Sequence, residues 1–218
     1  MEPAERIEYD RPAMESFPIA EERLPEEMEI LNVPPALNSM STVGPALREL
    51  LETILLTLVI FFMIRFAVEN FRIEGYSMEP NFHNDQFLLV NKLAYKIGHP
   101  QRNDVIIFHY PLNETKNYIK RVIGLPEDQV QVRAGQVYIN GELIPEKYPI
   151  EHADYDYGPV TVGAGEYFVL GDNRPESSDS HFWGMVPARD VIGKAWVSYW
   201  PPDLWGLVPD YAPAQASP

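Results

Sequence analysis

The sequence predicts a mainly β domain that follows a single transmembrane helix and a disordered N-terminal tail. Beyond residue 69, short runs rich in Val, Ile, Tyr and Phe alternate with Gly, Pro, Asn and Asp, the pattern of strands and turns. A long apolar stretch precedes these runs, and neither a long helical period nor a repeat of roughly 20 to 50 residues follows it. These observations favour one β-rich domain behind a membrane anchor.

Residues 1–45 form the predicted disordered tail. They are rich in proline and in acidic residues, and their apolar residues are too sparse to show a helical or strand period. Such a segment cannot bury enough apolar surface to offset the entropy of ordering its backbone.

The stretch from Leu50 to Val68 is nineteen residues long, and its only charged residues, Glu52 and Arg65, lie near its ends. We predict a transmembrane helix over residues 48–68. Its uninterrupted apolar part, residues 53–64, would also suit a buried helix or a cleavable signal. A cleavable signal is disfavoured because an acidic, proline-rich segment precedes the stretch. Too few basic residues flank it to fix its orientation.

The β-rich domain is predicted over residues 69–205, with a flexible tail over residues 206–218. The Asn140-Gly141 pair is a strong signal for a tight hairpin. The predicted strands are Phe87–Asn91, Val105–Tyr110, Tyr118–Ile123, Val130–Arg133, Gln136–Ile139, Tyr167–Leu170 and Ala195–Tyr199.

Composition excludes several classes of function. The chain has 32 acidic and 17 basic residues and a net charge of -15, which argues against nucleic acid as a partner. It has no cysteine, which excludes thiol catalysis, thiolate metal sites and disulfides. Its five histidines lack the spacing of metal ligands. We therefore expect no metal and no other cofactor.

Three segments carry residues capable of chemistry: residues 75–80 (GYSMEP), 118–126 (YIKRVIGLP) and 171–184 (GDNRPESSDSHFWG). Taken alone, Ser77 in the first segment is more typical of a turn, since a serine hydroxyl is a weak nucleophile without a nearby base. Lys120 interrupts an apolar strand. It either extends its amine into water at a sheet edge, or it is buried with a lowered pKa and is competent as a base.

A Ser-Lys pair is a known variant of the catalytic triad. The third segment is either an exposed turn or a polar shell around such a pair. In the second case Ser177 accepts a hydrogen bond from the lysine amine, while Asp172, Arg174 and Asp179 stiffen the loop. The residues alone do not decide between these alternatives.

In this order behind a membrane span, the three segments resemble the serine, lysine and glycine-aspartate-asparagine boxes of bacterial type I signal peptidases. The resemblance extends over residues 45–202. It implies the β-rich catalytic domain of that family. It also implies a membrane-bound serine endopeptidase, without cofactor, that removes signal peptides from exported preproteins by cutting after an Ala-x-Ala-like site.

The resemblance implies a role for each matching residue. Ser77 would form the acyl-enzyme with Lys120 as general base, Ser177 would orient the amine, and the Ser77 backbone N–H would help to form the oxyanion hole. Gly75 stands where some members carry a serine that donates a second bond to the oxyanion.

Two further departures from the family pattern lie close to these residues. Asp179 would stabilise the third segment, but His181 stands where the family often has arginine. Asn81 stands where threonine is more usual, and we expect this change to be tolerated.

The resemblance also implies shallow apolar pockets for small substrate side chains, although each residue alone would be typical of a core. The residues expected to line these pockets are Phe71, Ile73, Met78, Phe82, Tyr118 and Ile119.

The expected partners are signal-peptide-bearing preproteins and the lipid bilayer. We expect a monomer that crosses the cytoplasmic membrane once, with its catalytic domain on the extracytoplasmic side.

Two alternative functions remain at this point. A repressor-type self-cleaving Ser-Lys protease would need a DNA-binding domain, for which residues 1–45 are unsuited. A non-catalytic membrane-tethered β scaffold would leave Lys120 and the polar third segment unexplained.

Overall fold

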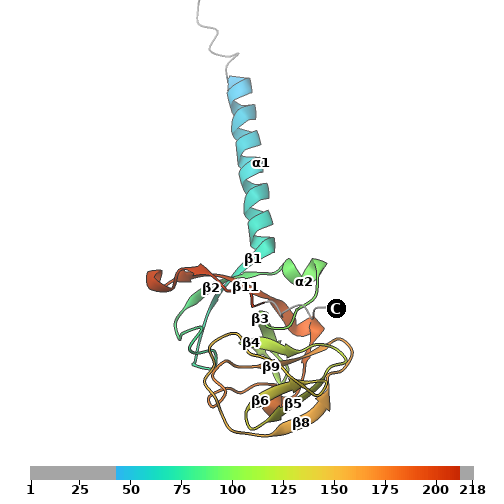
Figure 1. The fold of residues 1–218 in the computed structure, drawn as a ribbon. Helices are drawn as coiled ribbons and strands as arrows, with labels where there is room; N and C mark the ends of the chain where they lie inside the picture. Colours follow the sequence, from blue (N-terminus) through green and yellow to red (C-terminus); the bar gives the residue numbers. More distant parts are fainter. Residues whose placement is uncertain (1–42, 212–218) are drawn as a thin grey trace, which may run out of the picture. The chain divides into compact units, whose positions relative to one another are not determined.

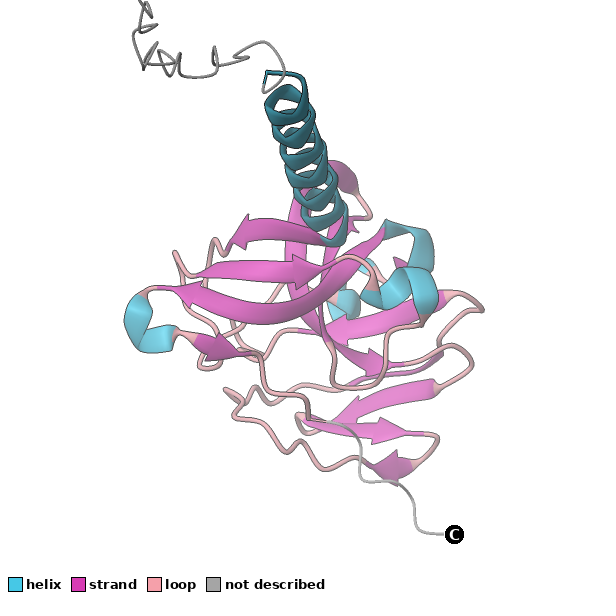
Figure 2. Cartoon of the chain, turned by 90° about the horizontal axis from the view of Figure 1, so that it is seen from above, coloured by secondary structure: helices cyan, strands magenta, loops and turns pink. Residues whose placement is uncertain are grey.

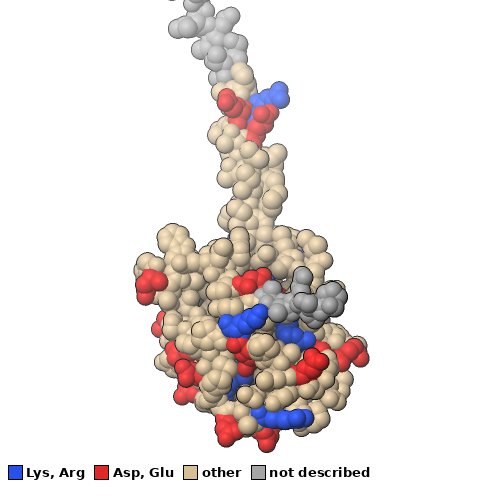
Figure 3. Space-filling view, viewed as in Figure 1, with Lys and Arg blue, Asp and Glu red and all other residues tan. Residues whose placement is uncertain are grey.

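The computed structural model describes residues 43–211, so the predicted tail lies almost entirely outside the described residues. The first described element is helix α1 (Val43–Ala67), which begins five residues before the predicted span. Its segment Gly44–Ala67 is long and apolar enough to cross a membrane. Large apolar side chains from Leu47 to Phe66 are exposed on all its sides, which suits a lipid environment. Figure 3 shows the charged side chains of α1 gathered near its N-terminal end on the face drawn.

Strands dominate the rest of the described chain (Figure 2). Within residues 43–211, the larger sheet is antiparallel and has eight strands in the order β1-β2-β11-β3-β4-β9-β10, with β12 paired to β11 (Figure 1). Its strands are β1 (Val68–Arg72), β2 (Phe87–Asn91), β3 (Val105–Tyr110), β4 (Asn113–Gly124), β9 (Glu166–Leu170), β10 (Val186–Pro187), β11 (Val191–Trp200) and β12 (Gly206–Leu207).

The smaller sheet has four antiparallel strands in the order β7-β6-β5-β8 among the described residues. Asn140 and Gly141, both at positive φ, form the tight turn between β6 and β7, as their sequence predicts. Its strands are β5 (Gln129–Arg133), β6 (Gln136–Ile139), β7 (Glu142–Leu143) and β8 (Tyr157–Thr161). The short helices of the chain are α2 (Ala94–Ile97), α3 (Ser180–Trp183), η1 (Ala188–Asp190) and η2 (Pro202–Leu204).

The mainly β fold is confirmed, and each of the seven predicted strands is present with shifts at some ends. Strands β1, β7, β8, β10 and β12 were not predicted. Strand β1 continues directly from α1 and carries polar residues, while β8 contains Pro159; neither shows the apolar alternation of a typical strand. The remaining three are only two residues long, too short for a sequence pattern.

The segment after Trp205 is not the flexible tail that we expected, as far as residue 211. Gly206–Leu207 pairs with β11, and the Val208 N–H donates to the Trp196 carbonyl. The Tyr211 carbonyl accepts a hydrogen bond from the Asn103 side chain, and the Tyr211 ring packs against Tyr148. These contacts attach the segment to the domain. Residues 212–218 lie outside the described residues.

Candidate active site

Ser77 lies in the turn that follows β1. The N–H groups of Asn81 and Phe82 both donate to the Met78 carbonyl, which closes the turn, and the side chains of Met78 and Phe82 are buried beneath it. The Ser77 carbonyl accepts a hydrogen bond of 3.0 Å from the Asn173 N–H. The serine is therefore held from below by the core and from the side by the third segment, while its own side chain stays partly accessible.

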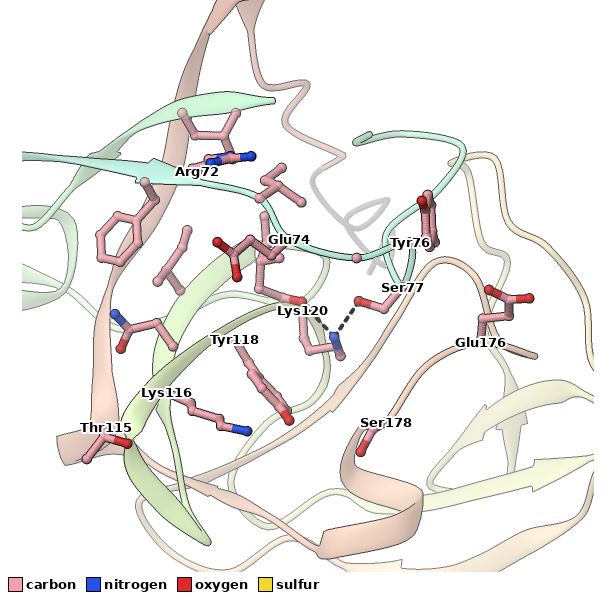
Figure 4. A pocket seen from close by; sticks show the side chains of 17 residues that line it. Arg72, Glu74, Tyr76, Ser77, Thr115, Lys116, Tyr118, Lys120, Glu176 and Ser178 are labelled. Carbon is pink, nitrogen blue, oxygen red and sulfur yellow. Dashed lines mark hydrogen bonds between the residues drawn. The ribbon is translucent and has the colours of Figure 1, made fainter. Parts of the chain in front are cut away.

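Lys120 lies on β4, paired with Ile106 of β3, and its side chain is 4% exposed. Its Nζ lies 2.6 Å from Ser77 Oγ and 3.0 Å from the Ile119 carbonyl oxygen. Figure 4 shows the two side chains pointing toward one another across the cleft. The strand is thus not a solvent-facing edge at Lys120, and the structure brings the two residues within hydrogen-bond distance.

Burial lowers the pKa of the Lys120 amine to about 8, because a charged ammonium loses its hydration in the interior. The nearby carboxylates of Asp179 and Asp172 act in the opposite direction and raise the pKa. Desolvation is the larger effect. The neutral amine, which can accept a proton from a serine hydroxyl, is therefore accessible near neutral pH.

Asp179 stabilises the third segment from within. Its buried carboxylate accepts a hydrogen bond from the Gly171 N–H at 2.9 Å. An added Cβ at Gly171 would lie 2.4 Å from the Ser77 carbonyl oxygen and 2.2 Å from Ser177 Oγ. Only glycine lets the segment approach Ser77 this closely.

His181, which stands where arginine is more usual, lies beside Asp179. Its Nδ1 lies 2.5 Å from Asp179 Oδ1, and its ring stacks on Tyr155 with 4.8 Å between ring centroids. The imidazole therefore contacts the Asp179 carboxylate through a single ring nitrogen.

Ser177 does not make the hydrogen bond that we expected. Its hydroxyl is buried and has no hydrogen-bond partner among the described residues, while the Lys120 amine bonds to Ser77 and Ile119. The hydroxyl instead lies beside Gly171, on the side of that residue where a Cβ would project. Sequence spacing does not fix which way a loop side chain turns, and this expectation depended on that direction.

Asp172 and Arg121 form a buried ion pair that the sequence analysis missed. Both side chains are 1% exposed, and Arg121 donates two hydrogen bonds to the carboxylate, of 2.8 and 2.6 Å. Asn81 adds a third at 2.8 Å, so its amide makes a contact of its own in place of the more usual threonine. In the sequence, the position of Arg121 next to Lys120 in an apolar strand was the feature that could have indicated a buried charge. The pair links β4 to the third segment.

Arg174 also stiffens the third segment. Its Nε donates to the Gly171 carbonyl at 2.9 Å, and its guanidinium pairs with Glu146. The partner Glu146 comes from the loop after β7, and no motif in the sequence connects that loop with the site.

A cleft of about 630 Å³ opens beside Ser77 and Lys120. Its walls are the chain from Phe71 to Ser77 and the β4 segment from Thr115 to Lys120, with Glu176 and Ser178 at one side. Of the six residues predicted to contact substrate, Phe71, Ile73, Tyr118 and Ile119 line this cleft. Met78 and Phe82 do not: they are 1% and 4% exposed and belong to the core that supports the serine turn. The apolar character of a residue does not show whether it lines the cleft or lies in the core behind the cleft.

The Ser77 backbone N–H donates to no acceptor among the described residues. Gly75 has a φ of 100°, a conformation that strains any residue with a side chain, and its N–H donates to the Asn84 side chain. A serine hydroxyl at this position would therefore require a different backbone.

Within residues 43–211, no cluster of His, Asp or Glu is arranged to hold a metal ion.

Comparison with known proteins places the site in a family. The model of the family described as signal peptidase, peptidase S26, matches residues 47–200. The chain belongs to the signal peptidase family. The family prediction from the three segments is thereby confirmed, and it leaves no basis for the repressor-type and scaffold alternatives.

Relatives in this family align over most of the chain. A signal peptidase I from Leptolyngbya laminosa is 43% identical over 73% of this chain and 83% of its own length. A probable signal peptidase I-2 from Synechocystis sp. is 39% identical, over 77% of this chain and 80% of its own. A signal peptidase I from Pseudomonas aeruginosa is 35% identical over 82% of each chain. A solved signal peptidase I from Enterococcus faecalis is 38% identical, with a TM-score of 0.40, and covers 44% of this chain and 95% of that one.

The Arg121–Asp172 pair yields a prediction about stability. Arg121→Met leaves the Asp172 carboxylate buried without its cation, which should lower the free energy of unfolding by about 3–5 kcal/mol. Urea unfolding of the full chain in detergent micelles measures this. Adding Asp172→Asn removes the uncompensated charge and should recover part of the loss. A single variant within about 1 kcal/mol of the wild type would contradict the role given to the pair.

Proposed function

We propose that this chain is a membrane-bound serine endopeptidase that removes N-terminal signal peptides from exported preproteins. The observation that carries the proposal is the contact of 2.6 Å between Ser77 Oγ and the buried Lys120 amine, at the side of an open cleft. The relatives, which are known or probable signal peptidases I, supply the substrate class.

In the proposed mechanism, Ser77 Oγ attacks the scissile carbonyl while the neutral Lys120 amine takes the hydroxyl proton. The Ser77 backbone N–H, which has no acceptor within the part of the chain that the structure describes, donates to the developing oxyanion. The resulting ammonium gives its proton to the leaving amine, and the acyl-enzyme forms. The amine that leaves is the N-terminus of the mature protein. Water then attacks the ester with Lys120 again as base, which releases the signal peptide and regenerates the free serine.

The fold supports binding of the substrate in an extended conformation. Among the described residues, Asn117 to Ile119 of β4 pair with β3 along one edge only, since pairing with β9 begins at Arg121. The other edge is therefore free to pair with an added peptide strand. In an extended peptide, alternate side chains point the same way, so the two alanines of an Ala-x-Ala site would both face the cleft wall. The apolar walls at Phe71, Ile73, Tyr118 and Ile119 suit such small side chains.

The bilayer is part of the proposal. Helix α1 would anchor the chain once, and the exposed Trp196 and Trp200 of β11 and Trp205 after it would lie at the membrane surface, where tryptophan is favoured. Anchor and signal helix then hold the cleft and the scissile bond at one depth, which raises their effective concentration. The chain would act as a monomer, because one copy supplies the serine, the lysine and both walls of the cleft.

The catalytic roles of the pair are tested by removing each side chain. Ser77→Ala should abolish cleavage of a purified preprotein, and Lys120→Met should slow it by at least about 10²–10⁴-fold, since methionine fills the buried slot without a basic nitrogen. Lys147→Met, at an exposed lysine that does not line the cleft, is the control and should cleave normally. Cleavage at the wild-type rate by correctly folded Lys120→Met would contradict the mechanism.

The pKa of Lys120 predicts the pH profile. Because the reactive amine is the neutral form and its pKa is about 8, kcat/KM should fall as pH decreases below 8, approaching about tenfold per pH unit. The Asp179 carboxylate raises this pKa, so Asp179→Asn should move the acid limb to lower pH. A wild-type profile flat between pH 8 and pH 5, measured with an unchanged substrate, would refute Lys120 as the base.

Because the chain has no cysteine, its orientation in the membrane can be tested by labelling single introduced cysteines. Exported preproteins present their cleavage sites beyond the cytoplasmic membrane, so we expect the β domain on the extracytoplasmic side. A single cysteine at the exposed Glu142 should then react with an impermeant thiol reagent in intact cells, whereas Ser16→Cys should react only after lysis. The reverse pattern of labelling would place the domain in the cytoplasm and contradict the proposal.

A further inference from the structure

A small hollow of about 120 Å³ lies apart from the catalytic cleft, between α2 and the start of β11. Its lining includes Lys92, Lys96 and His99, together with Tyr95 and Ile192. The volume is well below the roughly 300–1,000 Å³ of pockets for drug-sized ligands. The hollow therefore suits a compact charged group and not a peptide segment.

The hollow is fixed to the end of the proposed membrane span. The Lys92 N–H donates to the carbonyl of Ala67, the last residue of α1, at 2.9 Å. The Lys96 Nζ lies 3.7 Å from the centroid of the Phe66 ring, and β1, which follows α1 without a break, pairs Val68 with Asn91. Sheet register, backbone bond and cation–π contact all place the two lysines at the last turn of the helix.

The length of α1 places this turn in the headgroup layer. Twenty-four apolar-rich residues, Gly44–Ala67, span about 36 Å at a rise of about 1.5 Å per residue. The hydrocarbon core of a bilayer is about 30 Å thick, so the helix ends extend beyond it. Lipid phosphates lie at this level. The exposed apolar side chain of Ile97, 89% accessible, is suited to the same boundary.

The charges around the hollow favour an anion. The Lys92 amine forms an ion pair of 3.0 Å with the Glu69 carboxylate. The Lys96 amine has no carboxylate within ion-pair distance among the described residues. The buried Asp104 behind Tyr95 does not repel an anion strongly, because it accepts the Tyr95 hydroxyl and pairs with Lys194 at 2.6 Å. This concentration of basic groups stands out in a chain of net charge -15.

We propose that the hollow binds the phosphate of an anionic phospholipid headgroup, with Lys96 as the main contact and Lys92 and His99 beside it. The inference rests on α1 spanning the bilayer, as in the proposed function. A headgroup held here would fix the rotation and depth of the β domain against the membrane. A lipid suits the site better than free phosphate, because its acyl chains keep it in the layer where the hollow lies and so raise its effective concentration.

The test is retention of lipid by the full chain. Purified protein in a neutral detergent is titrated with phosphatidylglycerol or with phosphatidylcholine of the same acyl chains, and bound lipid is counted by native mass spectrometry. We expect phosphatidylglycerol to bind more tightly by about fivefold or more, the effect of roughly one lysine at an anionic surface. Lys96→Glu should abolish the preference. Lys147→Glu makes the same change of charge at an exposed site elsewhere and should keep it.

Three results would overturn the inference. They are equal retention of the two lipids, a preference that survives Lys96→Glu, or displacement of phosphatidylglycerol by an equal concentration of inorganic phosphate, which would identify a site for free phosphate. Peptide cleavage is not part of the readout. A chain that retains phosphatidylglycerol through Lys96 but cleaves no preprotein would refute the proposed function alone, whereas an active chain without lipid preference would refute the headgroup site alone.

Discussion

The active-site arrangement depends on the removal of one amine from water. Lys120 is 4% exposed, and the cost of burying its charge lowers the amine's pKa toward the range in which a neutral base exists. Two carboxylates oppose this effect, so the apolar packing around β4 has to outweigh them. The core is therefore not a passive support, because the basicity of the amine is set by how completely β3, β4 and the serine turn exclude water.

The polar residues of the third segment act mainly on the backbone. Asp179 bonds to the Gly171 N–H, Arg174 to the Gly171 carbonyl, and the Asn173 N–H to the Ser77 carbonyl. These bonds converge on the few backbone groups that determine where Ser77 stands. Buried hydrogen bonds of this kind are costly to break, since each leaves an unsatisfied polar group. They explain why a loop crowded with turn-forming residues is ordered.

The sequence predicted the fold class well because alternation and turn residues are local signals, and the strands from β2 to β11 carry them. It also grouped Ser77, Lys120 and the third segment through a family pattern. It did not predict the direction of the Ser177 hydroxyl, the burial of Met78 and Phe82, or the pairing of Arg121 with Asp172. Each of these depends on contacts between segments distant in the chain. The packed segment up to Tyr211 was missed for the same reason.

Lys120 and Arg121 are neighbours on β4 with their side chains on opposite faces of the sheet. One faces the serine, and the other faces the interior and holds Asp172. A slip of one residue in the β3–β4 register would exchange these faces. Ser77 would then meet a guanidinium, which stays protonated at any physiological pH and cannot accept a proton. The register of β3 and β4 therefore determines whether Ser77 has a neighbouring side chain that can accept its proton.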